Sequence, residues 1–241
     1  MKKMLVVGAS GATGRLLTRI LIEKNIKVIA IVRNKNSLDR LASLHSNLHV
    51  VEAEVSNLSI SDLAPMLKEC NTALSCLGHN LTFKGLFGHP RRLVTDTIEK
   101  ITLAIEANNL EHVTRVILMN TNGNSNRDIS EKPPLSQRMV IGILRLVLPP
   151  HVDNEKAADY LRLNVKNDHK NIEWAAVRPD SLIDEDHVTP FEVYASPTRN
   201  AIFDSVPTSR INVAEFMSEL ACNNELWSKW KGKMPVVYNR A

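Results

Sequence analysis

The sequence has few cysteines, the residues whose disulfide bonds stabilise many small or exported proteins. Only three cysteines, Cys70, Cys76 and Cys222, occur among 241 residues, and none of them forms a Cys-x-x-Cys pair. We therefore expect three reduced thiols. Aromatic residues make up 5% of the chain, whereas the hydrophobic fraction of 44% and the charged fraction of 23% are ordinary for a globular protein. These proportions exclude a disordered, collagen-like or disulfide-stapled chain.

Long hydrophobic runs and blocks of like charge are also missing. No apolar run approaches the ~18 residues needed to cross a bilayer. The apolar stretch near the N-terminus is shorter than the about 7–15 residues of a secretory signal. The basic residues are scattered, although the formal net charge is +4. We expect a cytoplasmic protein with no membrane span and no nucleic-acid partner.

Several motifs of well-known chemistries are absent. There is no Gly-x-Ser-x-Gly elbow, which argues against an α/β-hydrolase. No Gly-x-x-x-x-Gly-Lys-Ser/Thr loop is present, which argues against a P-loop nucleotidase. The eight histidines are dispersed, and no His or Cys cluster has zinc spacing, so we expect no metal site.

Strand-like apolar runs alternate with helical stretches along the chain. The periodicity predicts strands at 3–7, 27–32, 48–51, 72–77, 116–119, 172–177 and 235–238, and helices at 12–24, 92–108, 153–167 and 213–222, the last one capped by Asn212. Residues 122–134 are expected to form a loop. This alternation predicts an α/β fold, a Rossmann-like doubly wound parallel sheet with helices on both faces. We expect a single domain over 1–241, with 180–210 as an irregular elaboration on the substrate side.

The most informative motif lies between the first expected strand and the first expected helix. Three glycines recur there as Gly-x-x-Gly-x-x-Gly, at Gly8, Gly11 and Gly14. Glycine permits a tight turn and lets a pyrophosphate approach the backbone, and the helix N-terminus then offers free N–H groups. The strand before and the helix after the motif are the context that confirms it. We predict that the cofactor-binding residues here are Gly8, Ser10, Gly11, Ala12, Thr13 and Gly14.

At the end of the second expected strand, a basic residue stands at the position where NAD-binding sites have an acidic residue. An Asp or Glu about 20 residues after the glycines holds the ribose 2′-hydroxyl in NAD-preferring sites. Here Arg33 follows the strand, and a guanidinium can pair with a 2′-phosphate. The sequence therefore predicts a preference for NADP(H) over NAD(H).

Six stretches in order carry a resemblance to a known family. They are VVGASGATG from Val6, VRN from Val32, ALSCLG from Ala73, VILMNT from Val116, AVRP from Ala176 and SRINVA from Ser209. Together they resemble the atypical short-chain dehydrogenase/reductase superfamily, and within it NmrA-like and NAD(P)H-binding flavin-reductase-like members. The resemblance implies that Leu77 and Gly78 close the nucleotide pocket and that residues after the fifth strand line its nicotinamide side.

The catalytic pair of many such enzymes is incomplete here. They use Tyr-x-x-x-Lys together with a serine, where the lysine lowers the tyrosine pKa and holds the ribose. In the similar segment Val152 takes the place of the tyrosine, and Lys156 keeps the lysine position. Thr121 stands near the serine position. We predict catalytic roles for Thr121 and Lys156, with Lys156 on the nicotinamide ribose, and consider His79 and His151 as further proton donors.

Three functions agree with these features. The first hypothesis is an NADPH-dependent oxidoreductase that reduces a flavin, quinone or carbonyl compound, in which positioning supplies most of the catalysis. The alternatives are a non-catalytic NADP(H) redox sensor and a nucleotide-sugar epimerase-like isomerase. The apolar segment 135–148 is interpreted as a buried helix, a substrate lid or dimer face, or an interfacial membrane helix. Expected partners are a planar, apolar small molecule and a second copy or a regulatory protein.

Overall fold

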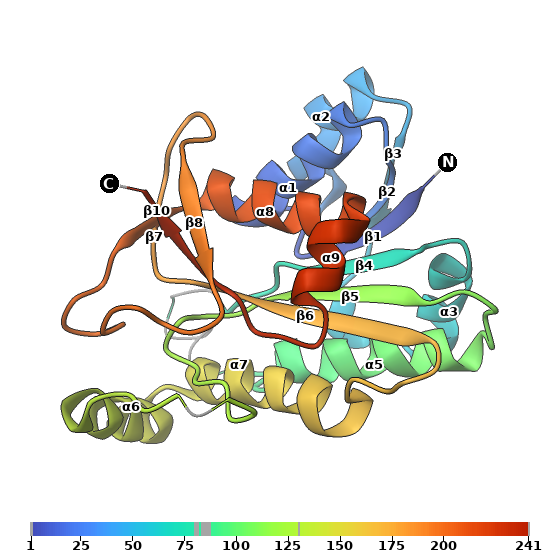
Figure 1. Ribbon diagram of the computed structural model, residues 1–241. Helices are drawn as coiled ribbons and strands as arrows, with labels where there is room; N and C mark the ends of the chain where they lie inside the picture. Colours follow the sequence, from blue (N-terminus) through green and yellow to red (C-terminus); the bar gives the residue numbers. More distant parts are fainter. Residues whose placement is uncertain (1, 80–81, 83–87, 130, 241) are drawn as a thin grey trace.

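A large, mostly parallel sheet forms the centre of the molecule. The computed structural model describes residues 2–79, 82, 88–129 and 131–240. Among these residues, eight strands form one sheet in the order β3-β2-β1-β4-β5-β6-β10-β8, and only β8 runs antiparallel to its neighbour (Figure 1). The strands are β1 (Lys3–Val7), β2 (Lys27–Val32), β3 (Leu48–Glu52), β4 (Thr72–Ser75), β5 (Thr114–Met119), β6 (Ile172–Pro179), β8 (Phe191–Tyr194) and β10 (Val236–Asn239). A small parallel pair is formed by β7 (Ser181–Ile183) and β9 (Pro207–Ser209). The predicted Rossmann-like fold is confirmed.

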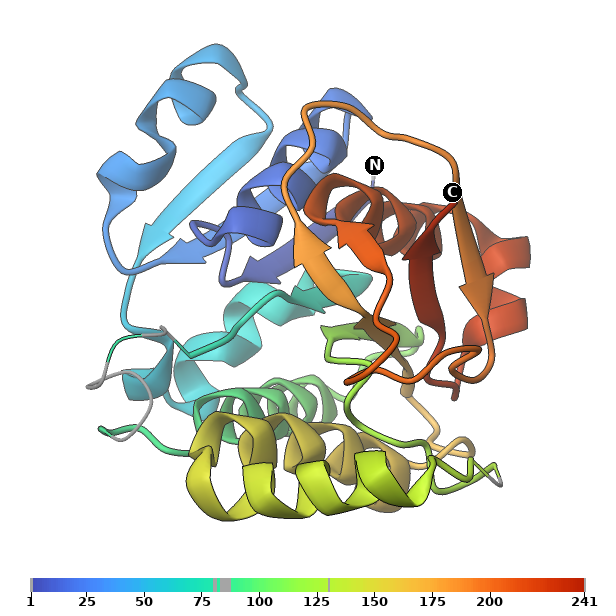
Figure 2. The same cartoon turned by 90° about the vertical axis from the view of Figure 1, so that its left-hand side faces the viewer.

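Helices cover both faces of this sheet. On one face lie α1 (Ala12–Glu23), α8 (Arg210–Cys222) and α9 (Asn224–Trp230), and on the other lie α3 (Ile60–Lys68), α5 (Leu93–Ala107) and α7 (Pro149–Tyr160), as Figure 1 shows. Short elements are η1 (Lys35–Leu38), α2 (Asp39–Leu44), η2 (Val55–Asn57) and a π turn, η3 (Leu161–Val165), which ends α7. The remaining helix, α6 (Leu135–Val147), lies beyond the ends of α5 and α7 at one edge of the molecule (Figures 1 and 2).

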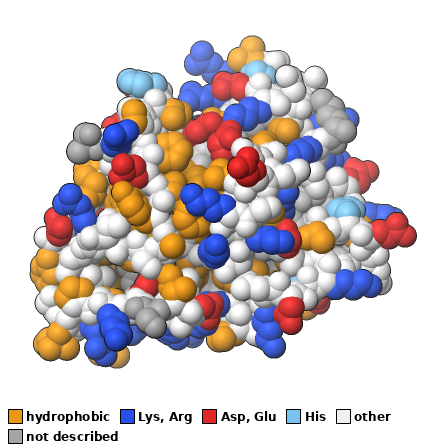
Figure 3. Space-filling view, viewed as in Figure 1, with side chains coloured by type: hydrophobic (Ala, Val, Ile, Leu, Met, Phe, Trp, Pro, Cys, Tyr) orange, Lys and Arg blue, Asp and Glu red, His pale blue; other side chains and the backbone are white. Residues whose placement is uncertain are grey.

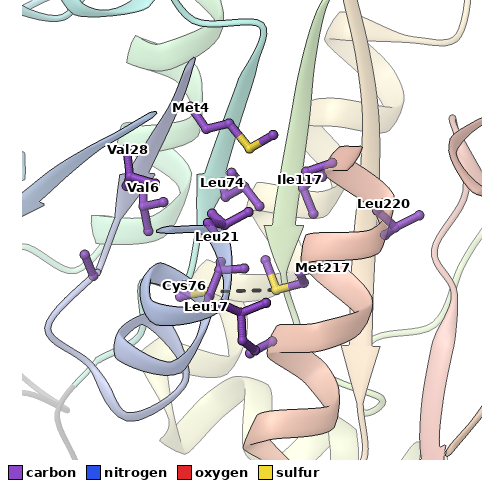
Figure 4. Close-up of a cluster of buried hydrophobic side chains, with 14 of the residues drawn as sticks. Met4, Val6, Leu17, Leu21, Val28, Leu74, Cys76, Ile117, Met217 and Leu220 are labelled. Atoms are coloured by element: carbon purple, nitrogen blue, oxygen red, sulfur yellow. Dashed lines mark hydrogen bonds between the residues drawn. The ribbon is translucent and has the colours of Figure 1, made fainter. Parts of the chain in front are cut away.

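The strands are apolar on both faces because both faces are covered. In β1, Met4 and Val6 pack toward α1 and α8, while Leu5 and Val7 pack toward α3 and α5. Figure 4 shows the first of these clusters, in which the Cys76 sulfur lies 4.0 Å from the Met217 sulfur.

The three cysteines, all within the described residues, form no disulfide, as expected. Burial raises the pKa of the Cys70 and Cys76 thiols to about 12. Both side chains therefore act as small core hydrophobes rather than as reactive thiolates.

Two helix starts differ from the sequence-based expectation. Helix α8 begins at Arg210, and its cap is Ser209, whose hydroxyl accepts a hydrogen bond from the Asn212 backbone N–H at 3.3 Å. Asn212 is buried, and its amide bonds Thr189 and Asn239 instead. Helix α7 begins at Pro149 rather than at residue 153, because proline is well accommodated in the first turn of a helix.

The region predicted to be irregular contains more structure than expected. Residues 180–210 contribute β7, β8 and β9.

Helix α3 lies outside this region and was not predicted from the sequence. Helix α3 has a clear start signal, a capping box in which Ser59 and Asp62 bond each other's backbone N–H groups. Residues 122–134 form turns and loop in their described part, and Ser130 lies outside the described residues.

Helix α6 has its apolar stripe exposed. Only Gln137 and Ile141 are buried in it, whereas Met139 is 63% exposed and Leu146 is 86% exposed. Hydrophobic side chains accordingly gather on the surface at the end of the molecule where α6 lies (Figure 3). The interpretation of segment 135–148 as a buried helix is therefore wrong. Within the described residues, α6 and every other helix fall short of the length and hydropathy that a membrane crossing requires.

Candidate functional site

A large cavity opens at the carboxyl ends of the parallel strands. This main cleft has a volume of about 970 Å³. Ligands of open α/β sheets bind at this edge, outside the carboxyl ends of the strands. Its lining includes eight of the predicted cofactor-binding residues, Gly8, Ser10, Gly11, Ala12, Thr13, Arg33, Leu77 and Gly78. The structure thus brings together these residues from three separate segments of the sequence.

Two glycines of the predicted phosphate loop have no room for a side chain. Gly8 has a φ of +74°, and a Cβ there would lie 2.8 Å from the Cys76 carbonyl group. A Cβ on Gly14 would overlap the Gly8 carbonyl oxygen. Gly14 does not line the cleft itself. Its role is to let the first turn of α1 pack directly against the loop.

The N-terminus of α1 is available to a ligand. Its N-cap is Gly11, which offers no side chain to the first backbone N–H groups, and the first turn has no acidic residue. Three other helices, α3, α8 and α9, satisfy part of these groups with the side chains of Ser59, Ser209 and Asn223. An uncapped helix start that opens into a large cleft is a good site for an anionic group such as a pyrophosphate.

The far end of the main cleft carries a positive side chain. Arg33 follows β2, is exposed, and lines the cleft together with Glu54, Ser56 and Asn57. Glu54 follows β3, so one carboxylate borders the same end. The opposite end of the cleft is formed by Met119 of β5 and Leu182 of β7.

The segment after β4 forms the middle of the cleft wall. A Cβ on Gly78 would have no neighbour within 4 Å among the described residues, so it would project into open space. Gly78 is therefore not required for packing, in contrast to Gly8. A glycine at this position instead keeps the cleft wide.

His79, the next residue, is held by a buried carboxylate. Its Nε2 lies 2.8 Å from Asp153 Oδ2, and the Asp153 side chain on α7 is fully buried. The same carboxylate accepts hydrogen bonds from the backbone N–H groups of Val94 and Thr95, at the start of α5. Burial opposes ionisation of Asp153, but the hydrogen bonds from His79, Thr95 and the backbone outweigh it and lower its pKa. His79 is thereby fixed in the wall of the main cleft.

A second, smaller cavity lies beside the main cleft. This small cavity has a volume of about 210 Å³ and brings together the end of β5, helices α6 and α7, and the segment before β9. Thr121 and His151, two of the proton donors considered from the sequence, both line it. The complete lining is Thr121, Gly123, Ile141, Leu144, His151, Asp180, Ser181, Ala201, Ile202 and Ser205.

Two charged side chains, Glu155 and Arg145, lie behind His151. Its Nε2 lies 3.4 Å from Glu155 Oε1, while Arg145 of α6 donates two shorter hydrogen bonds to Glu155, at 2.8 and 2.9 Å. Burial opposes ionisation of Glu155, but the contacts with His151 and Arg145 outweigh it and lower its pKa to about 2. Asp180 behaves differently, because burial raises the pKa of its carboxyl.

The structure does not bring Lys156 to either cavity. Its side chain is exposed on α7, and it is absent from the lining of both the main cleft and the small cavity. On the same helix Asp153 bonds His79 of the main cleft and Glu155 lies behind His151 of the small cavity, and both are buried, whereas Lys156 is on the exposed side. The tyrosines are also engaged elsewhere: Tyr160 bonds Thr102, Tyr194 bonds Glu192 and Tyr238 bonds Asn122.

Sequence reasoning missed a buried polar network that frames the small cavity. Asn120, Asn122, Asn124 and Asn126 alternate after β5, and all four are buried. The alternation was visible in the sequence, although the residues lie in turns and loop rather than in a strand. The backbone N–H of Asn122 bonds the Pro179 carbonyl at 2.9 Å, which continues the pairing of β5 with β6.

An ion pair with almost no exposure completes this network. Arg178, fully buried, forms two hydrogen bonds to Glu131, which is 4% exposed. Arg178 also donates to the Asn124 and Met234 carbonyl oxygens. Since Glu131 and Arg178 are 47 residues apart, no local pattern could have predicted the pair.

The sequence matches a protein-family model described as NAD(P)H-binding over residues 8–224. This span contains the phosphate loop, the residues of the small cavity and most of the sheet. A search of curated protein sequences found no match.

Solved structures with the same fold include several oxidoreductases. The oxidoreductase ylbE from Lactococcus lactis is 16% identical, with a TM-score of 0.69 over 99% of this chain and 91% of that one. A short-chain dehydrogenase/reductase (wide type) from Veillonella parvula, solved in complex with NADP, is 14% identical, with a TM-score of 0.67 over 100% and 95% of the two chains. The anaerobillin reductase ChuY from Escherichia coli is 17% identical, with a TM-score of 0.64 over 99% and 97%. At such identities the likeness concerns the fold alone.

Proposed function

Because the chain belongs to the NAD(P)H-binding family, we propose that it is an NADPH-dependent oxidoreductase that reduces an organic acceptor, such as a quinone, a carbonyl compound or a flavin. The observation that carries this proposal is the uncapped start of α1, which opens into a cleft of about 970 Å³. A cavity of this size accommodates a dinucleotide, since it lies at the upper end of the about 300–1,000 Å³ of small-molecule sites.

The preference for NADPH rests on Arg33. A guanidinium forms paired, charge-assisted hydrogen bonds with phosphate oxygens, and Arg33 lines the end of the cleft beyond the phosphate loop. Glu54 borders the same end and could accept a ribose hydroxyl of NADH instead. Arg33 favours NADPH and Glu54 favours NADH, and a measurement of both affinities distinguishes the two.

The chain's own residues supply binding and orientation. The backbone N–H groups of Ala12 and Thr13 would hold the pyrophosphate, and Leu77 and Gly78 would border the nicotinamide end. When bound, NAD(P)H supplies a hydride, which a quinone or carbonyl compound takes up together with a proton. No tyrosine lines either cavity, so proton delivery falls to solvent or to the histidines of the site.

The test is a calorimetric titration with NADPH and NADH. Gly11→Trp places a large side chain in the cleft and should abolish binding of both nucleotides, whereas Gly142→Trp on exposed α6 should not. Arg33→Asp should weaken NADPH binding by about 10–100-fold, the loss of a charge-assisted hydrogen-bond pair, and NADH binding by far less. Lys35→Asp removes the same charge two residues away, outside the cleft lining, and is the matched control.

Each result has a clear reading. Equal loss of NADPH and NADH affinity in Arg33→Asp would remove the 2′-phosphate role. Retained binding in Gly11→Trp would show that the nucleotide does not occupy the main cleft.

A non-catalytic NADP(H) sensor is the second candidate. It is favoured by one observation, the exposed position of Lys156 together with a valine at residue 152, which leaves the usual tyrosine and lysine pair unformed. Turnover separates the two functions. A reductase oxidises NADPH faster than background with at least one quinone, aldehyde or flavin, whereas a sensor binds NADPH with no such acceleration.

A further inference from the structure

The small cavity lies where a substrate would have to lie. Met119 and Leu182 line the main cleft, whereas Thr121 and Ser181 line the small cavity. Both cavities therefore have lining residues at the same two places in the fold, the end of β5 and the start of β7. A ligand in the small cavity would lie next to the end of the main cleft that is farthest from Arg33.

The side chains of Thr121 and His151 lie close to one point of this cavity. A Cβ built on Gly123 would lie 3.4 Å from His151 Cε1, 3.7 Å from Thr121 Oγ1 and 3.6 Å from Ile141 Cδ1. The imidazole, the hydroxyl and an apolar side chain thus surround the small space in front of Gly123. Glu155 lies behind the imidazole, with Oε1 3.4 Å from His151 Nε2, and is itself held by two hydrogen bonds from Arg145.

The opposite wall is apolar and the volume is limited. Ile141 and Leu144 of α6 and Ile202 provide apolar surface, and the polar residues Asp180, Ser181 and Ser205 complete the rim. The volume of about 210 Å³ is smaller than the about 300 Å³ at which sites for drug-sized ligands begin, and equals the share of about seven water molecules in the liquid. A single ring with a short polar substituent fills such a space, whereas a three-ring flavin would extend beyond it.

We propose that the small cavity is the substrate site and binds a one-ring carbonyl compound, with the carbonyl oxygen at His151 and Thr121 and the ring against Ile141 and Leu144. The inference rests on the proposed oxidoreductase function and narrows its substrate class. It also gives α6 a role: its inward side chains form one wall of the site, while its exposed stripe faces solvent. Ligands of this class include benzaldehydes, cyclohexenones and simple benzoquinones.

Direct binding tests the inference without relying on turnover. The probe is 4-hydroxybenzaldehyde, titrated calorimetrically into the full chain with and without saturating NADP⁺. Gly123→Leu fills the space between His151, Thr121 and Ile141, and should weaken probe binding by at least about tenfold. The φ of Gly123 is not in the left-handed region, so leucine strains no backbone there. Gly142→Leu, which meets no atom within 4 Å among the described residues, is the matched control and should bind the probe like the parent.

A second variant guards against misfolding of the first. Ser205→Trp narrows the small cavity from its exposed rim and should also weaken binding of the probe. His151→Gln keeps a hydrogen-bond donor but alters its position, and should have a smaller effect than Gly123→Leu. NADPH affinity should stay within about twofold of the parent in all three, since none of them lines the main cleft.

The outcomes separate this inference from the proposed function. If the parent binds NADPH but not the probe, or if Gly123→Leu and Ser205→Trp both bind the probe like the parent, the small cavity is not the substrate site. If FMN binds and Gly123→Leu abolishes its binding, the one-ring limit is wrong. If the parent binds no nucleotide, the proposed function fails, whatever the probe does.

Discussion

The main cleft and the small cavity are built by different physical means. The wall of the main cleft depends on close approach of backbone to backbone, and Gly8 and Gly14 leave no room for a single added carbon. The wall of the small cavity depends on buried polar side chains, with Arg178 and Glu131 behind the loop that carries Thr121 and Gly123. Gly123, unlike Gly14, has ordinary van der Waals space around a Cβ.

This difference has a consequence for how each cavity tolerates change. A steric requirement concerns one position and one neighbour, so the effect of a substitution depends only on whether the added atoms fit at that position. A polar network shares its stability among several partners, and removal of one partner leaves the others buried and unpaired. Helix α7 serves both cavities, because Asp153 holds His79 of the main cleft and Glu155 lies behind His151 of the small cavity.

The largest effect is expected on the side of the small cavity. Glu131→Gln leaves the Arg178 guanidinium without its counter-charge, and breaking such a buried pair costs about 3–5 kcal/mol of unfolding free energy. Urea unfolding of parent and variant measures this loss. Pairing Arg178→Met with Glu131→Leu removes both charges, and the double variant should recover part of the loss. A double variant less stable than Glu131→Gln would mean that the hydrogen bonds to Asn124 and Met234, rather than the pairing, hold this region.

The next effect concerns the main cleft. Gly14→Ala places a carbon against the Gly8 carbonyl, and because both atoms belong to the backbone, we expect a loss of about 3 kcal/mol or more, at or above the upper end for overpacking. NADPH binding should be lost with it. The matched change Gly123→Ala should cost less than about 1 kcal/mol, since its nearest neighbour is a side chain at 3.4 Å. Equal losses in the two variants, measured by urea unfolding, would contradict the comparison.

The smallest effect is a pH dependence of the α7 region. The pKa of Glu155 is about 2 in the folded chain against an ordinary value of 4.5, so its contribution is complete above pH 4.5 and is lost as the pH falls toward 2. The contribution is at most about 3 kcal/mol, because each pKa unit corresponds to about 1.4 kcal/mol. Glu155→Gln should unfold with a shallower dependence on pH between 4.5 and 2 than the parent, in urea titrations at several pH values. Glu111→Gln, at an exposed position, is the control; a parent-like slope in Glu155→Gln would show that Glu155 does not contribute.

Local patterns predicted the elements that lie in the first half of the sheet. The bounds of β1 and β2 agree with the expected strands, and α1 begins at Ala12 as expected. These elements are predictable because a parallel strand buried on both faces is a continuous apolar run, and a helix after it repeats its apolar side chains every three to four residues. The glycine spacing could be recognised in the sequence for a similar reason. At each of these positions a side chain would crowd backbone atoms within six residues or in the segment after the adjacent strand.

The catalytic predictions illustrate the limit of such patterns. The resemblance implies catalytic roles for both Thr121 and Lys156, but the structure places Thr121 in the lining of the small cavity and leaves Lys156 exposed. Asp153, three residues before Lys156, is the residue of α7 that contacts the main cleft wall. A sequence gives the periodicity of a helix but not the direction in which each side faces, because this depends on what packs against it.

The sequence by itself determined the Rossmann-like sheet, the phosphate loop and the position of Arg33, because each depends on backbone geometry over a few consecutive residues. Only the tertiary structure decided which acids are buried, which histidine faces which cavity, and that α6 keeps its apolar stripe in solvent. Glu131 and Arg178, or His79 and Asp153, become partners only when segments 47 and 74 residues apart are folded against each other. Their chemistry is set by burial and by those partners, and neither is encoded at a single position.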